Sequence, residues 1–112
     1  MKEQKSKEGA LLEGVSMVRD ELVRLQTVKA RSAIVESLAS LSDASMAKAR
    51  TVNKTHLIHY PDLQGARQIL VSVSRSIREL SDGVGAKRVS MTEYKEHLSG
   101  FLASMSSAEE LI

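Results

Sequence analysis

The densest group of side chains able to bind a charged ligand lies between residues 48 and 59. No acidic residue occurs between Asp43 and Asp62. Such a cluster, at the end of one helix and in the following turn, could bind nucleic-acid phosphates in a salt-dependent way. The alternative is a solvated turn whose cations interact favourably with the C-terminus of the preceding helix. The members are Lys48, Arg50, Lys54, His56 and His59, followed one turn into the next helix by Arg67.

A second basic stretch follows in the later half of the chain and comprises Arg75, Arg78, Lys87 and Arg88. These side chains could line a DNA-facing surface or the inside of a ring. They could equally form the wet face of an amphipathic helix. We include Arg75 and Arg78 with the first cluster as the expected nucleic-acid contacts.

Other kinds of chemistry find no support in the sequence. Cysteine is absent, which excludes thiolate catalysis and disulfides. The many serines lie in no nucleophile elbow, and neither a phosphate-binding loop nor a dinucleotide fingerprint occurs. His56 and His59 stand three residues apart, but two histidines are too few for a tetrahedral zinc site. We therefore expect no catalytic residue, no metal and no cofactor, and a protein that is not an enzyme.

The elements that must position the basic residues are predicted to be helices. Only three of the 112 residues are aromatic, and no segment alternates apolar and polar residues as a strand does. A first apolar seam begins after Gly9, slips after Leu25 and resumes in a new phase at Ile34. Neither proline nor glycine occurs between Val15 and Asn53. This favours one long helix to about residue 53, with a break near residues 42–43 as the alternative.

The clearest periodicity lies in the segment 62–80, where apolar residues recur every three or four positions. Pro61 marks the turn before this helix, and Gly83 is suited to a left-handed cap at its end. A capping box from Ser90 to Glu93 starts a third helix. The seam of the second helix consists of Leu63, Ala66, Leu70, Val73, Ile77 and Leu80.

These elements predict an all-α protein, a long antiparallel helical hairpin with a shorter third helix. A hairpin alone buries too little apolar surface to offset its ordering cost, so we expect several copies to form an oligomeric bundle or ring. Residues 1–8 are expected to be a flexible charged leader, residues 9–84 the hairpin and oligomerisation core, and residues 85–112 the C-terminal helix and tail. The chain shows neither a signal peptide nor a membrane span, which favours the cytoplasm.

The segment from Tyr60 to Leu80, YPDLQGARQILVSVSRSIREL, together with the long helix before it, resembles the central oligomerisation hairpin of tailed-phage terminase small subunits. The resemblance covers roughly residues 15–84 and rests on layout. It implies a non-catalytic ring that binds viral double-stranded DNA in the host cytoplasm and engages the large terminase subunit, here through the C-terminal segment. One departure is the absence of the N-terminal helix-turn-helix that many members carry.

A different class of function also fits these patterns. A small helical protein-protein interaction module, such as a regulator, inhibitor or chaperone, would have no nucleic-acid role and would bind its partner through an exposed apolar stripe. The two hypotheses differ in expected mass and in affinity for DNA at low salt.

Overall fold

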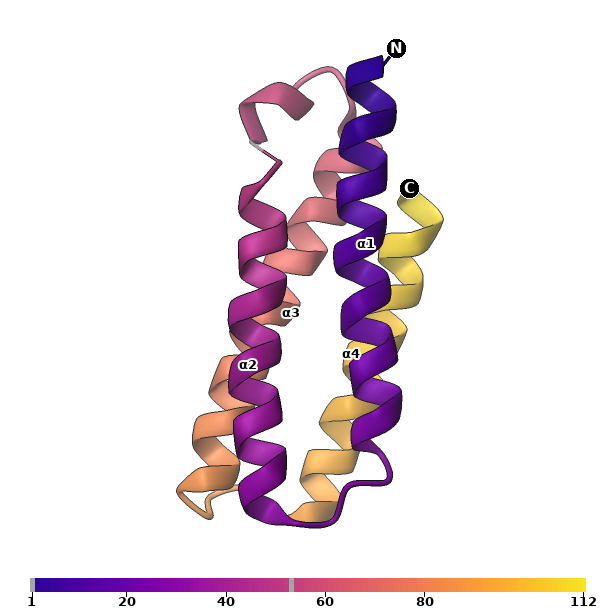
Figure 1. Cartoon of the computed structure of the whole chain (residues 1–112). Coiled ribbons are helices and arrows are strands. Elements are labelled where there is room, and N and C mark those ends of the chain that lie inside the picture. The colour runs from indigo at the N-terminus through magenta and orange to yellow at the C-terminus, as the bar shows by residue number, and fades with distance from the viewer. Residues whose placement is uncertain (1, 53) are drawn as a thin grey trace.

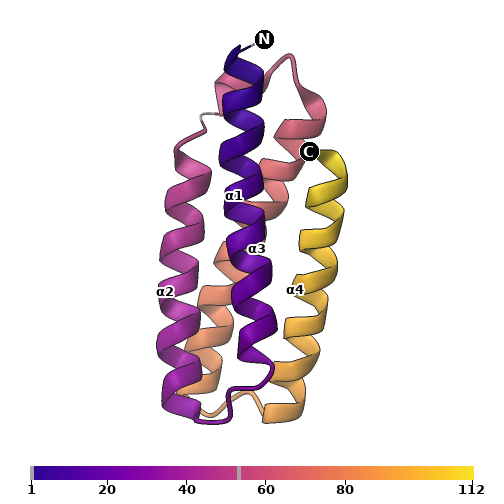
Figure 2. The same ribbon diagram turned by 45° about the vertical axis from the view of Figure 1, so that its right-hand side comes forward.

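In the described residues, four α-helices lie side by side in an antiparallel bundle that is 46 Å long and 20 by 17 Å across (Figure 1). The computed structural model describes residues 2–52 and 54–112, and the side chains of residues 8–52, 55 and 57–112. Each helix packs against the next in sequence, and the last returns against the first (Figure 2). Within the described residues there is no strand, so the all-α prediction is confirmed. The helices are α1 (Lys2–Leu25), α2 (Arg31–Arg50), α3 (Pro61–Gly85) and α4 (Met91–Leu111), with a short 3-10 helix η1 (Lys54–Leu57) before α3.

The predicted long first helix is wrong, because the chain turns between residues 26 and 30 and so divides it into α1 and α2. The last turn of α1 tightens, with the amide of Val28 donating to the carbonyl of Leu25 at 3.1 Å. The turn coincides with the slip in the apolar seam, where Lys29 and Ala30 are exposed. Folding back there places the two halves of the seam on one shared core. The alternative break near residues 42–43 does not occur, since α2 continues through it.

The seam of α3 is present as predicted, and all six of its residues are at most 5 % exposed. The neighbouring helices α2 and α4 cover the seam from two sides, and α1 also contacts α3 across the bundle. The seam that we expected to need neighbouring subunits is therefore covered within one chain. Self-association stays a prediction, but the uncovered hairpin that motivated it is absent.

Small polar residues let α2 and α3 pack closely along their length. The buried hydroxyl of Ser42 donates to the main-chain carbonyl of Ser74 at 2.7 Å. The hydroxyls of Ser45 and Ser74 lie 2.6 Å apart, and Ser81 donates to the carbonyl of Val35 at 2.9 Å. Every buried side-chain nitrogen or oxygen in the described part of the chain has a hydrogen-bond partner. These contacts make α2 and α3 a rigid pair.

The end of α3 differs from the prediction, because Gly83 is a buried residue inside the helix and does not form its left-handed cap. The left-handed residue is Lys87, with φ of 60°. Its amide donates to the carbonyl of Val84 at 3.1 Å, and the amide of Arg88 donates to that of Gly83 at 2.9 Å. This is the Schellman pattern of helix termination. Gly83 is needed for space, since a Cβ added there would stand 2.7 Å from Cγ2 of Val89.

The predicted capping box of α4 is confirmed, with the amide of Glu93 donating to Oγ of Ser90 at 3.1 Å. With 21 residues against 25 in α3, α4 is the shorter of the two helices, and it runs on through most of the C-terminal tail. The charged segment at the start of the chain, which was expected to be a flexible leader, is helical from Lys2 and forms the beginning of α1. In the described residues, no helix combines the length and apolar character required to cross a bilayer.

Candidate nucleic-acid interface

Three of the predicted contact residues meet in a groove of about 590 Å³ between α2 and α3. Arg50 is the last residue of α2, and Arg75 and Arg78 lie on the middle of α3. The groove also contains Ser42, Met46 and the acidic residues Asp43 and Glu79. We call Arg50, Arg75 and Arg78 the arginine row. Because α2 and α3 are fixed to each other by buried hydroxyls, the row is held on a rigid surface.

The three arginines of the row differ in their pairing. Arg78 forms an ion pair with Asp43 and donates to the carbonyl of Ala39 at 3.4 Å. Arg50 and Arg75 are exposed and have no ion-pair partner among the described residues. Two cations are therefore available to an anionic ligand, with a third neutralised beside them.

Lys48 does not join the row, because it points to the other side of α2. Its Nζ lies 3.0 Å from Oε2 of Glu13, which joins α2 to α1. Two residues along a helix are rotated by about 200°, so Lys48 and Arg50 face opposite neighbours. The predicted basic cluster is thus divided between two faces of α2.

Arg67 has a structural role at the end of α2. Its Nε donates to the carbonyls of Ala49 at 3.2 Å and Val52 at 2.7 Å. The last carbonyls of a helix lack partners within it, and a cation favours that end of the helix dipole. Arg67 therefore holds the C-terminus of α2 against α3.

A similar contact, which was not predicted from the sequence, joins α2 and α3 at the opposite end of the two helices. Arg31, the first residue of α2, donates from Nη1 to the carbonyl of Val84 at 2.9 Å, near the end of α3. An arginine at its own helix N-terminus is unfavourably placed for that helix dipole. That placement is a sequence signal that such a residue serves the C-terminus of an antiparallel neighbour.

Of the other predicted basic residues, those with described side chains lie apart from the row. His59 is exposed in the turn before α3, and the side chains of Lys54 and His56 lie outside the described residues. Lys87 and Arg88 are exposed in the α3–α4 connection, at the end of the bundle opposite that turn (Figure 1). Among the members whose side chains are described, the first basic cluster and the second stretch meet on one surface through the arginine row.

Two titratable groups of the described residues, Tyr94 and Arg24, have shifted pKa values. Burial raises the pKa of Tyr94 to about 12, with nearby Arg24 opposing that shift. The Tyr94 hydroxyl donates to the carbonyl of Leu25 at 3.5 Å, which ties α4 to α1. The carboxylate of Glu21 raises the pKa of Arg24 by accepting its hydrogen bonds. In residues 2–52 and 54–112, no group of three or more His, Asp or Glu is placed to hold a metal ion.

The arginine row is the part of the predicted site that the fold brings together, and it could bind a row of phosphates by charge and hydrogen bonding. Comparison of the chain with protein-family models, with curated proteins and with solved structures gave no match.

Proposed function

We propose that the protein is a non-catalytic adaptor that binds DNA through the arginine row. The observation that carries this proposal is that Arg50 and Arg75, which have no ion-pair partner in the described part of the chain, lie beside Arg78 in one groove. Arginine presents several N–H donors in a planar fork that matches phosphate oxygens. The chain as a whole has a formal net charge of +2, which does not oppose approach to a polyanion.

The length of the row suits a DNA strand. Arg75 and Arg78 are separated by about 4.5 Å along the axis of α3, at 1.5 Å per residue. Arg50 lies seven residues beyond Asp43, the partner of Arg78, which is about 10 Å along α2. Each strand of a duplex carries a phosphate every ~3.4 Å along its axis, so the row spans about three phosphates. Contacts of this kind give affinity without base specificity.

The test is a fluorescence anisotropy titration of a labelled duplex at several salt concentrations. Phosphate contacts by the two available arginines predict a slope of log K against log salt of about −2, at roughly 0.9 per phosphate. The double variant Arg50→Gln and Arg75→Gln should reduce the magnitude of that slope by about 2. Its low-salt affinity should fall at least about tenfold.

The matched control is the double variant Arg19→Gln and Lys95→Gln, which removes the same charge from α1 and α4. Arg19 pairs with Glu109 across those two helices, and Lys95 is exposed on α4. This control should keep the wild-type slope. If both double variants bind DNA equally well, the arginine row is not the interface.

The narrower role is a DNA-packaging adaptor that oligomerises and presents viral DNA to a large terminase subunit. Only the resemblance of the segment 60–80 and its surroundings supports that role. It requires a discrete multimer larger than a dimer, which light scattering at micromolar concentration measures directly. A monomer would exclude the ring while leaving DNA binding by the arginine row to be judged on its own test.

A second candidate, a protein-protein interaction module, is favoured by a separate observation. An open groove of about 770 Å³ lies between α1 and α2, on the side of α2 away from the arginine row, and apolar side chains lie at its base. The module predicts partner binding at that groove and no affinity for duplex DNA at low salt. The anisotropy titration therefore separates the two candidates.

A further inference from the structure

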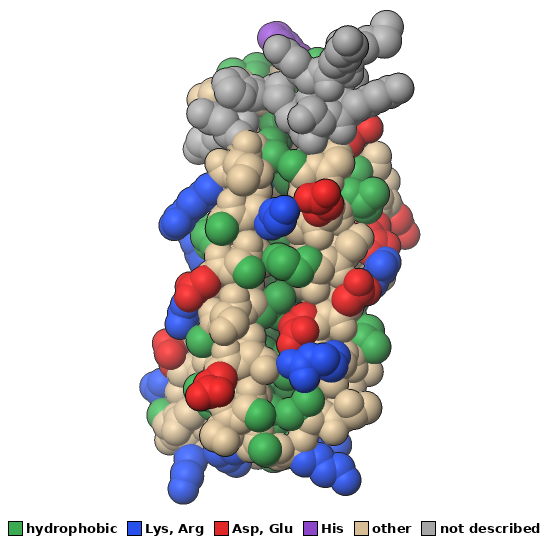
Figure 3. Space-filling model, viewed as in Figure 1, with side chains coloured by type: hydrophobic (Ala, Val, Ile, Leu, Met, Phe, Trp, Pro, Cys, Tyr) green, Lys and Arg blue, Asp and Glu red, His purple; other side chains and the backbone are tan. Residues whose placement is uncertain are grey.

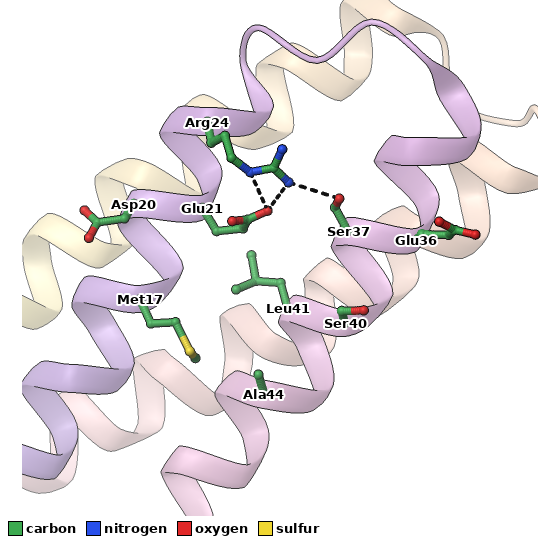
Figure 4. Close-up of a pocket in the computed structure, with 9 residues that line it drawn as sticks. All are labelled: Met17, Asp20, Glu21, Arg24, Glu36, Ser37, Ser40, Leu41 and Ala44. Carbon is green, nitrogen blue, oxygen red and sulfur yellow. Dashed lines mark hydrogen bonds and ion pairs between the residues drawn. The ribbon is translucent and has the colours of Figure 1, made fainter.

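The groove between α1 and α2 has an apolar floor that the bundle leaves uncovered. Met17 of α1 is half-buried, Ala44 of α2 is exposed, and Leu41 lies beneath them at 4 % exposure. Hydrophobic side chains line the furrow between the two helices, with acidic side chains on both sides of it (Figure 3). The close-up shows Met17, Leu41 and Ala44 projecting into the space between the helices (Figure 4).

Polar contacts join α1 to α2 at both ends of this floor. At one end, Lys48 of α2 bonds Glu13 of α1 at 3.0 Å. At the other end, Arg24 of α1 is held by Glu21 and donates to Oγ of Ser37 on α2 at 3.1 Å (Figure 4). Glu13 and Arg24 are 11 residues apart, which corresponds to about 16 Å of helix. The uncovered floor therefore has the length of about three helical turns.

The charge around the groove is opposite to that of the whole chain. Four carboxylates surround it, namely Glu13, Asp20, Glu21 and Glu36. Three cations oppose them, and each pairs with a carboxylate on α1: Lys48 with Glu13, Arg24 with Glu21, and Arg19 with Asp20 at 3.7 Å. Asp20 and Glu36 project from the outer edges of the two helices (Figure 4), and Glu36 has no ion-pair partner in the described part of the chain. A protein of net charge +2 thus presents an acidic edge at this one groove.

We infer that this groove docks a basic amphipathic helix of a partner protein. An amphipathic helix places apolar residues at intervals of three and four on one face, which suits a floor of this length. Methionine adapts its shape to different partners, and the small side chains of Ser37, Ser40 and Ala44 on α2 allow close approach. Lysine or arginine flanking the apolar stripe would face Asp20 on one edge and Glu36 on the other. The inference deepens the second candidate function and does not depend on DNA binding.

The probe is an 18-residue amphipathic peptide of leucine and lysine with leucines at positions i, i+3, i+4 and i+7. A second peptide of the same pattern carries glutamate in place of lysine. Titration calorimetry should show the lysine peptide binding at least about tenfold more tightly, because the groove attracts one and repels the other. Amide chemical shifts of the labelled protein locate the bound peptide.

The variant Ala44→Arg should weaken binding of the lysine peptide at least about tenfold, because it fills the groove and adds a like charge. The control is Ala103→Arg, which adds the same charge to an exposed position of α4 outside the groove and should bind as wild type. Both positions are exposed, so neither change disturbs the core. A further control, Arg50→Gln with Arg75→Gln, should leave peptide binding intact, which separates this inference from the DNA proposal.

Three outcomes would overturn the inference. The two peptides could bind equally well, or the two arginine variants could behave alike, so that the groove would not be the binding surface. Light scattering could also show a dimer that Ala44→Arg dissociates and Ala103→Arg preserves. In that case the occupant of the groove would be a second copy of this chain and not a basic helix of a partner.

Discussion

Replacement of Lys87 by glycine is expected to stabilise the protein. Lys87 holds φ of 60° in the Schellman motif that ends α3. The left-handed conformation costs a residue with a Cβ about 1–2 kcal/mol and costs glycine almost nothing. The greater freedom of glycine in the unfolded chain offsets about 0.4–1 kcal/mol of that gain. The net expectation is a free energy of unfolding higher by about 0.5–1 kcal/mol.

The measurement is urea unfolding followed by far-ultraviolet circular dichroism, with thermal unfolding as a second readout. A chain of this size should gain about 2–4 °C in Tm. Lys87→Ala is the matched control, because it removes the same charge and long side chain but keeps the Cβ. It should leave the free energy of unfolding within about 0.5 kcal/mol of wild type. If Lys87→Gly is no more stable than Lys87→Ala, the left-handed conformation at residue 87 does not cost the folded protein free energy.

Four further predictions concern two glycines, one buried serine and one buried tyrosine. Gly83→Ala should lower the free energy of unfolding by about 1–2 kcal/mol, since its Cβ would stand 2.7 Å from Val89. Gly100→Ala, whose Cβ meets nothing within 4 Å, should raise it by about 0.5–1 kcal/mol in the same urea assay. Ser74→Ala should lower the free energy of unfolding by about 1 kcal/mol, and Ser74→Leu should lower it by at least about 3 kcal/mol. Equal losses for the two variants would show that α2 and α3 are not closely packed at Ser74. Because the pKa of Tyr94 is raised from 10.0 to about 12, the unfolded chain loses that proton first. Stability should therefore fall as pH rises from 10 through 12, and Tyr94→Phe should remove that part of the fall.

Local signals predicted those parts of the fold that local interactions decide. The period of the α3 seam and the Ser90 capping box each specify a helix without reference to the rest of the chain. The turn between α1 and α2 has no such signal. It contains neither glycine nor proline, and Ala30 at the start of α2 makes no side-chain capping bond. Tertiary packing decides that turn, because only folding back buries both halves of the first seam.

The candidate site shows the same division between local and tertiary information. Arg75 and Arg78, three residues apart, share a helix face as their spacing requires. Lys48 and Arg50 were grouped because they are close in sequence, yet a rotation of about 200° separates them. A wheel projection of residues 31–50 would have divided that cluster. The capping roles of Arg31 and Arg67 depend on which helices are antiparallel neighbours. The arrangement of the helices was mispredicted because the turn between α1 and α2 was not foreseen.

The central claim is that α2 contributes to two separate binding surfaces, the arginine row and the groove between α1 and α2. One amide chemical-shift titration of the isotopically labelled protein tests it most directly. Short duplex DNA is added first, and the leucine-lysine peptide is added second. We expect DNA to change the chemical shifts of amides around Arg50, Arg75 and Arg78. The peptide should then change those around Met17 and Ala44 without displacing the DNA. Shifts spread over the whole surface, or one set of amides responding to both ligands, would contradict the claim.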